Sequence, residues 1–165
     1  MLDKKIQDAL NEQIKDEYYA SYLYLSMSAW CAAQNLSGFA HWMRLQSQEE
    51  LAHALKLLDY MCNRGAHVVL HAIDKPPSDF KSMLDMFEQS LRHEQKVTEK
   101  INELYELALR EKEHATEIEL QWFIREQVEE EKTATDIVER LKLVQQDGTA
   151  LLLLDNQLGA RTLAE

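Results

Sequence analysis

Apolar residues recur at intervals of three and four over most of the chain, the spacing that places side chains on one face of an α-helix. This pattern predicts four long helices. They cover about Lys4 to Gln34, Ser37 to Arg64, Ser82 to Arg110, and the stretch from a short charged junction to about Gln145. The first pair and the second pair are each joined tightly, so the two helices of a pair should run antiparallel.

The connection between the second and third helices is long. From Ala66 to about Ser82 the sequence has no sustained helical period, and Pro76 and Pro77 exclude a continuous helix there. Gly65 is suited to the left-handed conformation that ends a helix. At the other end, Ser82 with Asp85 resembles a capping box. Two short connections around one long crossover predict an all-α four-helix bundle.

A short fifth helix is predicted at the C-terminus. Asp147 and Gly148 break the fourth helix, and the sequence TALLLLDNQLGARTLAE follows. Leu151, Leu154 and Leu158 share one side of this segment, which is more apolar than an isolated terminal helix should be in water. We therefore expect it to pack against other subunits. Residues 1–165 are interpreted as one domain.

Composition agrees with a helical bundle and limits the partners. The 165 residues include only four glycines and two prolines, and the formal net charge is -11. With no Lys/Arg-rich run, a nucleic-acid partner is not expected, and cations are favoured instead. No apolar stretch approaches the length that spans a membrane. Cys31 and Cys62 are too isolated for a disulfide framework, which indicates a reducing, cytoplasmic location.

Each of the four long helices carries a glutamate on its apolar face. These residues are Glu17, Glu50, Glu94 and Glu130. His53 follows Glu50 by three residues and projects from the same face, which is the E-x-x-H arrangement of two-iron carboxylate bundles. None of the four faces carries Lys or Arg. The buried carboxylates therefore need cations from elsewhere.

Two divalent metal ions would balance the charge of four carboxylates, while His53 and Gln127 add neutral ligands. Oxygen ligands with one imidazole suit Fe(II) or Mn(II) better than calcium or structural zinc, so iron is favoured. The alternative without metal is a structural bundle whose inward glutamates hold protons or face an interface. That alternative leaves the alignment of acids on four helices unexplained.

The segments NEQIKDEYYASYLYLSMSAWC, QEELAH, HEQ and LQWFIREQVEEEK resemble those of the non-haem bacterial ferritins over essentially the whole chain. The resemblance implies a ferritin-like fold and an assignment of ligands. Glu17, Glu50 and His53 would bind one iron. Glu50, as a bridge, would bind the second iron with Glu94 and Glu130. Gln127 would lie beside the pair.

The same resemblance implies further roles. A third iron position would use Glu49, Glu126 and Glu129, with Glu130 shared. Tyr24 would lie near the iron pair and donate an electron or a hydrogen bond, whereas Trp122 is interpreted as packing. Haem is not expected, because Leu51 stands where haem-binding bacterioferritins carry methionine, and Thr133 stands where they carry the histidine of a second E-x-x-H.

The expected function is iron storage with ferroxidase activity. Fe(II) would be oxidised by dioxygen or hydrogen peroxide, and Fe(III) oxide would be stored inside a shell of 24 subunits. The alternative is a soluble diiron or dimanganese oxidase, or a peroxide scavenger, that stores no iron. The histidines outside the acidic faces are expected at the surface or at interfaces: His41, His67, His71, His93 and His114.

Overall fold

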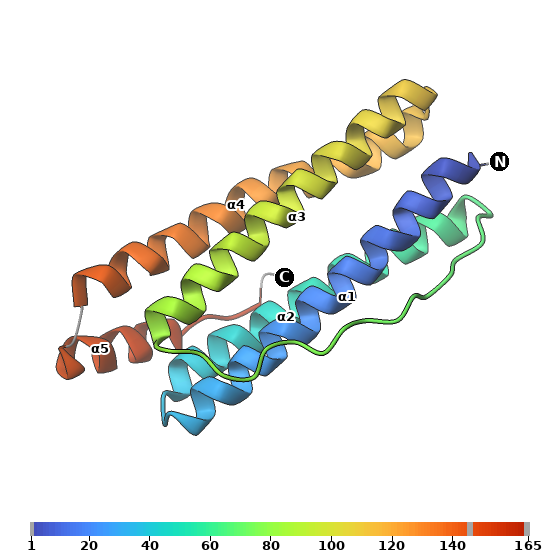
Figure 1. The fold of residues 1–165 in the computed structure, drawn as a ribbon. Helices are drawn as coiled ribbons and strands as arrows, with labels where there is room; N and C mark the ends of the chain where they lie inside the picture. Colours follow the sequence, from blue (N-terminus) through green and yellow to red (C-terminus); the bar gives the residue numbers. More distant parts are fainter. Residues whose placement is uncertain (1, 145–146, 164–165) are drawn as a thin grey trace.

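The computed structural model describes residues 2–144 and 147–163 (Figure 1). Within these residues it contains five helices and no strand. The helices are α1 (Lys4–Ala33), α2 (Ser37–Asn63), α3 (Met83–Glu111), α4 (His114–Val144) and α5 (Gly148–Leu158). The predicted all-α bundle with one long crossover and a short fifth helix is confirmed. The predicted ends of the first three helices fall within one residue of the observed ends. The predicted end of the fourth helix at about Gln145 lies outside the described residues.

The ends of the helices follow the local chemistry of the sequence. The Asp3 side chain accepts a hydrogen bond from the backbone N–H of Lys5 at the start of α1. Ser82 accepts from the N–H of Asp85 at 3.1 Å, as the capping pattern predicted. Gly65 has φ 64°, the left-handed conformation expected after α2.

The long crossover runs along the outside of the α1–α2 pair (Figure 1). Side chains of α1 bind its backbone, because an extended segment has no helical partners of its own. Asn11 donates to the carbonyl of His67 at 3.3 Å and accepts from the N–H of Val69 at 3.0 Å. Further along, Ser26 donates to the carbonyl of Pro77 at 2.7 Å.

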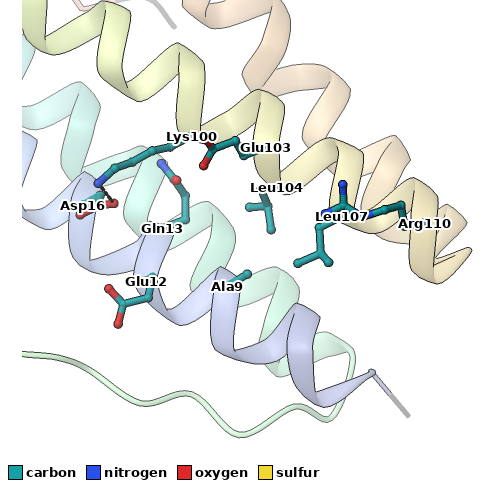
Figure 2. A pocket seen from close by; sticks show the side chains of 9 residues that line it. All are labelled: Ala9, Glu12, Gln13, Asp16, Lys100, Glu103, Leu104, Leu107 and Arg110. Carbon is teal, nitrogen blue, oxygen red and sulfur yellow. Dashed lines mark hydrogen bonds and ion pairs between the residues drawn. The ribbon is translucent and has the colours of Figure 1, made fainter.

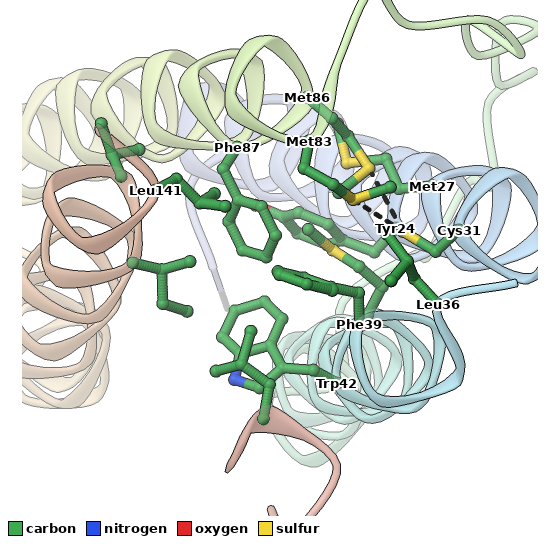
Figure 3. Close-up of a cluster of buried hydrophobic side chains, with 14 of the residues drawn as sticks. Tyr24, Met27, Cys31, Leu36, Phe39, Trp42, Met83, Met86, Phe87 and Leu141 are labelled. Carbon is green, nitrogen blue, oxygen red and sulfur yellow. Dashed lines mark hydrogen bonds between the residues drawn. The ribbon is translucent and has the colours of Figure 1, made fainter. Parts of the chain in front are cut away.

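The core consists of two hydrophobic clusters. One cluster includes Phe39, Phe87 and Leu141 and lies where α5 packs on the bundle (Figure 3). The other includes Leu10 and Phe123. On each of the four long helices, the predicted inward glutamate lies between the residues of one cluster and those of the other. The bundle thereby places a polar layer between two apolar ones.

The leucine stripe predicted on α5 packs within the same chain. Leu154 and Leu158 are buried in the first cluster of this same chain, and Leu151 packs against that cluster. The leucines that stay exposed are Leu152 and Leu153, which are 57% and 66% exposed. The predicted stripe thus holds α5 on its own bundle, and contact of α5 with other subunits stays a prediction.

None of the helices built from the described residues combines the length and apolar character that crossing a bilayer requires.

Candidate metal centre

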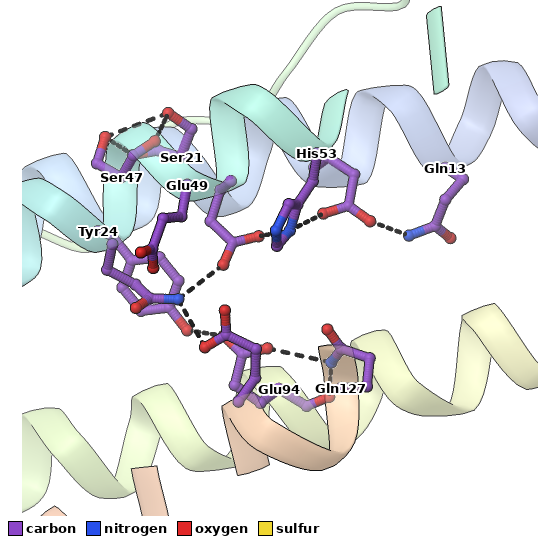
Figure 4. A network of polar contacts seen from close by, with 12 residues as sticks. Gln13, Ser21, Tyr24, Ser47, Glu49, His53, Glu94 and Gln127 are labelled. Carbon is purple, nitrogen blue, oxygen red and sulfur yellow. Dashed lines mark hydrogen bonds and ion pairs between the residues drawn. The ribbon is translucent and has the colours of Figure 1, made fainter. Parts of the chain in front are cut away.

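The polar layer contains every residue that the sequence placed on the inward faces as a metal ligand. All of them are at most 7% exposed. They are Glu17, Glu50, His53, Glu94, Gln127 and Glu130. Because α1 to α4 each contribute at least one of these side chains, the bundle brings together residues that are far apart in the sequence (Figure 4).

One group of donor atoms comes from α1 and α2. Atoms of Glu17, Glu50 and His53 all lie within 4.8 Å of one another. Nδ1 of His53 is 3.4 Å from Oε2 of Glu50 and 3.9 Å from Oε2 of Glu17. Trp122 packs edge-on against the imidazole, with ring centroids 5.3 Å apart, and so limits its rotation. Glu17, Glu50 and His53 would together offer a metal ion two carboxylates and one imidazole.

A second group joins α2 to α3 and α4. Atoms of Glu50, Glu94 and Glu130 lie within 4.8 Å of one another. Glu50 belongs to both groups, so the two groups share one carboxylate. Such an arrangement is compatible with a site for two metal ions.

Three amide side chains orient the carboxylates. Gln46 donates to Oε1 of Glu50 at 2.9 Å and to Oε2 of Glu130 at 2.8 Å. Gln127 donates to Oε2 of Glu94 at 3.2 Å. The third amide, Gln13, donates to Oε1 of Glu17 at 2.8 Å. Sequence reasoning gave no role to Gln46 or Gln13.

Gln13 also connects the site with the molecular surface. It lines a pocket between α1 and α3, together with Asp16 and Lys100, which form an ion pair at 2.6 Å (Figure 2). Since the Gln13 amide donates to Glu17, it stands between this surface pocket and the first group of donor atoms. The pocket itself contains none of the predicted metal ligands.

The electrostatics of the layer favour cations. Burial raises the pKa of Glu17 to about 8, and the charge of Glu50 adds to the effect. Burial likewise raises the pKa values of Glu50, Glu94 and Glu130, with repulsion between these carboxyl groups as a further cause. Among the described residues, Oε2 of Glu17 is buried without a hydrogen-bond partner. A buried, unpartnered oxygen among mutually repelling acids fits a site for metal ions.

Tyr24 lies beside this layer, as predicted. Its hydroxyl donates to Oε1 of Glu94 and accepts from Oγ of Ser90 at 3.3 Å. Burial and the neighbouring carboxylates raise the pKa of Tyr24 well above its usual value. The phenol is therefore held in its neutral form with its proton directed at a predicted metal ligand.

His93 is half-buried, with part of its ring inside the bundle. Its Nε2 is buried and has no partner among the described residues. The ring packs edge-on against Tyr24, with centroids 6.0 Å apart, and also against Tyr19. Burial lowers the pKa of His93 to about 4, so the ring is neutral near pH 7. Its contact with Tyr24 places it directly behind the polar layer.

The predicted third position is only partly assembled. His53, Glu126 and Glu130 have donor atoms within 4.8 Å of one another. Glu49 is outside this group, because its carboxylate accepts a hydrogen bond from Arg161. Glu129 is exposed. The structure thus brings His53 to this position, which the sequence did not assign to it, and places Glu49 on another partner.

A four-helix bundle with one long crossover and a buried layer of glutamates and histidine defines the class of ferritin-like carboxylate proteins. The Ferritin-like domain family matches residues 7–144. The chain belongs to this family.

Individual relatives make the comparison closer. The chain is 43% identical to a bacterial non-heme ferritin of Bacteroides fragilis, over 98% of this chain and 100% of the relative. It is 40% identical to one of Staphylococcus aureus, over 100% and 99%. Among solved structures, an engineered closed form of Archaeoglobus fulgidus ferritin has a TM-score of 0.98 and 48% identity, over 99% and 100%. The open-pore ferritin of that archaeon gives 0.97 and 48%, over 98% and 100%. The predicted resemblance to non-haem bacterial ferritins is confirmed.

Proposed function

We propose that the chain oxidises Fe(II) at a dinuclear site within each subunit and stores the product as Fe(III) oxide inside a shell of 24 subunits. Iron storage follows from its place among the non-haem ferritins. The proposal adds the site, its residues and the assembly. The two free cysteines are consistent with action in the reducing cytoplasm.

The observation that carries the proposal is the shared carboxylate of Glu50. It belongs to a group with Glu17 and His53 and to a second group with Glu94 and Glu130. Two Fe(II) ions bound in these groups would be neighbours bridged by one side chain. Each ion supplies one electron, so a pair delivers two electrons to dioxygen or hydrogen peroxide without diffusing together first.

The protein residues prepare the site for this charge change. In the metal-free protein the raised pKa values of Glu17 and its neighbours keep protons on part of the carboxyl layer near pH 7. Fe(II) replaces those protons, because the ligands bind a metal in their deprotonated form. Once deprotonated, the carboxylates stabilise Fe(III) more than Fe(II), since their attraction grows with the charge of the ion.

Amide donors keep the carboxylates in place while protons and metal ions exchange. Gln46 donates to the bridging Glu50 and to Glu130, and thereby spans α2 and α4. Gln127 donates to both the backbone carbonyl and the carboxylate of Glu94. Since an amide stays neutral, these contacts orient the ligands without adding to their charge.

Movement of Fe(III) away from the dinuclear site frees it for another cycle. Glu126 and the exposed Glu129 continue the acidic surface of α4 beyond the buried layer. His53 and Glu130 belong to the buried layer and also lie within 4.8 Å of Glu126 donor atoms. We assign to these acids the passage of iron toward the mineral and its nucleation.

The test is anaerobic loading of the metal-free protein with Fe(II), followed by air. Absorbance of Fe(III) reports oxidation, and analytical ultracentrifugation reports the particle mass and its mineral load. Glu50→Ala and His53→Ala should abolish the fast oxidation while the particle keeps its mass. Asp59→Ala, an exposed acid on the same helix, is the matched control and should oxidise iron like the parent.

Two results would contradict the proposal in different ways. Equal oxidation rates in the parent and in Glu50→Ala would show that iron is not oxidised at the proposed dinuclear site. A protein that oxidises iron at this site, remains a small particle and retains no mineral would act as a diiron oxidase without storage.

A further inference from the structure

Arg161 lies beyond α5, yet its side chain reaches α2. Its guanidinium donates to Oε2 of Glu49, to Oε1 of Gln46 at 3.0 Å, and to the backbone carbonyl of Trp42 at 3.3 Å. It also lies over the Trp42 ring, 4.3 Å from the centroid. The segment after α5 is thus fixed to α2 by one cationic side chain.

Glu49 stands between two cation positions. Its carboxylate is paired with Arg161. The same guanidinium binds Gln46, whose amide donates to Oε2 of Glu130, so Glu49 lies next to the ligands of the candidate third position. Glu126 and Glu130 lie together with His53 in a group able to hold a metal ion, and Glu49 is absent from that group. Oε2 of Glu49 is held by Arg161 and is not available to complete the group.

We propose that Arg161 competes with a metal ion for Glu49 and thereby limits how tightly each subunit binds a third cation. This inference rests on the proposed function, because it concerns the position adjoining the dinuclear site. An arginine suits the role because it remains charged at all physiological pH values. A third ion that recruits Glu49 must first break the charged hydrogen bond to Arg161.

The remaining contacts of Arg161 allow such an exchange without release of the C-terminal segment. The ring and the carbonyl of Trp42 and the Gln46 amide oxygen still bind the guanidinium when Glu49 has left. His41 Nε2 also bonds to the backbone carbonyl of Arg161 at 2.9 Å. Glu49 is therefore the partner that is lost most simply, by rotation of one side chain on α2.

Arg161 also links this competition to the dinuclear ligands. Its bond to Oε1 of Gln46 fixes the orientation of that amide, so the nitrogen faces Glu50 and Glu130. The reversed amide would place its oxygen against two carboxylates. Because Gln46 retains this bond when Glu49 is released, binding of a third ion leaves the bridging carboxylate in place.

The test uses Zn(II), which is not oxidised, in equilibrium dialysis against the assembled metal-free protein. The parent should bind two ions per subunit at the groups that share Glu50 and a third more weakly. In Arg161→Gln the third ion should bind roughly tenfold more tightly, the equivalent of one charged hydrogen bond. The gain should disappear in Arg161→Gln/Glu49→Gln. Arg140→Gln, which removes an exposed positive charge on α4, should match the parent.

Unchanged affinity for the third ion in Arg161→Gln would overturn the inference, as would a gain that survives in the double variant. Arg161→Lys keeps the charge but loses the planar fork. Its affinity should lie between those of the parent and Arg161→Gln, and this variant decides the question if Arg161→Gln does not assemble. Absence of Glu50-dependent Zn(II) binding in the parent would instead contradict the proposed function. If Arg161→Gln binds the first two Zn(II) ions like the parent and its affinity for the third is unchanged, only the role of Arg161 is contradicted.

Discussion

Oδ1 of Asp155 in α5 accepts a hydrogen bond from the backbone N–H of Phe39 in α2 at 2.9 Å. The first N–H groups of a helix have no partner within the helix, so a buried carboxylate from elsewhere stabilises them. Gly38 allows this approach. A Cβ atom at Gly38 would lie 1.8 Å from the backbone oxygen of Asp155. The packing of α5 on α2 thus depends on both Gly38 and Asp155.

Replacement of Gly38 by alanine should displace α5, because the clash is with backbone and not with a flexible side chain. We expect a loss of about 1–3 kcal/mol or more in the free energy of unfolding, together with faster proteolysis after residue 147. Chemical denaturation and limited proteolysis measure these effects. Gly148→Ala is the control, since a Cβ there meets nothing within 4 Å. Equal stability of the two variants would show that α5 is not held by this approach.

Removal of the Asp155 carboxylate should leave the buried N–H of Phe39 without its acceptor. Asp155→Ala is expected to lose about 1–3 kcal/mol of stability. Asp155→Asn keeps an acceptor oxygen and should retain most of it. Denaturation curves of Asp155→Ala and Asp155→Asn measure the two stabilities. Their difference separates the contribution of the hydrogen bond from that of the buried side-chain volume. If Asn is as damaging as Ala, the hydrogen bond to Phe39 is not the main contribution.

The metal-free protein should become less stable as the pH rises from about 5 to 8. Burial raises the pKa of Glu17 from 4.5 to about 8 and also raises those of Glu50, Glu94 and Glu130. Over this interval the folded state therefore binds more protons than the unfolded state, and stability falls with rising pH. Above the raised pKa values the loss is complete.

Thermal unfolding midpoints at several pH values, with and without Zn(II), measure this dependence. Glu17→Gln, which has no proton to lose, should flatten the curve. Added metal should restore stability at the high-pH end, because metal ions replace the protons. A midpoint of the metal-free parent that does not change or rises between pH 5 and 8 would contradict the electrostatic account of the buried layer.

Loss of the Tyr24 hydroxyl should affect Glu94 more than packing. Tyr24→Phe keeps the ring in the core and removes the donor to Oε1 of Glu94. We expect the metal-free protein to lose about 1–3 kcal/mol of stability and iron oxidation to slow. The control is Tyr19→Phe, because Tyr19 is partly buried and packs against His93, as Tyr24 does. Parent-like stability and oxidation in Tyr24→Phe would reduce Tyr24 to a packing residue.

Much of the fold and the buried ligands was predictable, because helical periodicity is a local property. Each of Glu17, Glu50, Glu94 and Glu130 interrupts an apolar stripe within its own helix, and all four are buried together. The reason is simple geometry: residues on the inward faces of four long helices meet at the bundle axis. Their roles as metal ligands stay a prediction.

Contacts between distant segments could not be predicted in the same way. Arg161 and Glu49 are 112 positions apart, and the sequence around Arg161 has no feature that signals its partner. The packing of the α5 leucines on the chain's own core was not predicted, because periodicity shows which leucines share a face but not which surface covers them. The contact of His93 with Tyr24 was not predicted, because the residues next to His93 in the sequence are polar.

The most direct test of the dinuclear site is a stopped-flow titration in which increasing Fe(II) per subunit is mixed with oxygenated buffer. The amplitude of the fast oxidation phase should saturate at two Fe(II) per subunit, one for each group that shares Glu50. That phase should be absent in Glu50→Ala and unchanged in Asp59→Ala. An amplitude that saturates at one Fe(II) per subunit, or a fast phase that persists in Glu50→Ala, would contradict a dinuclear centre bridged by Glu50.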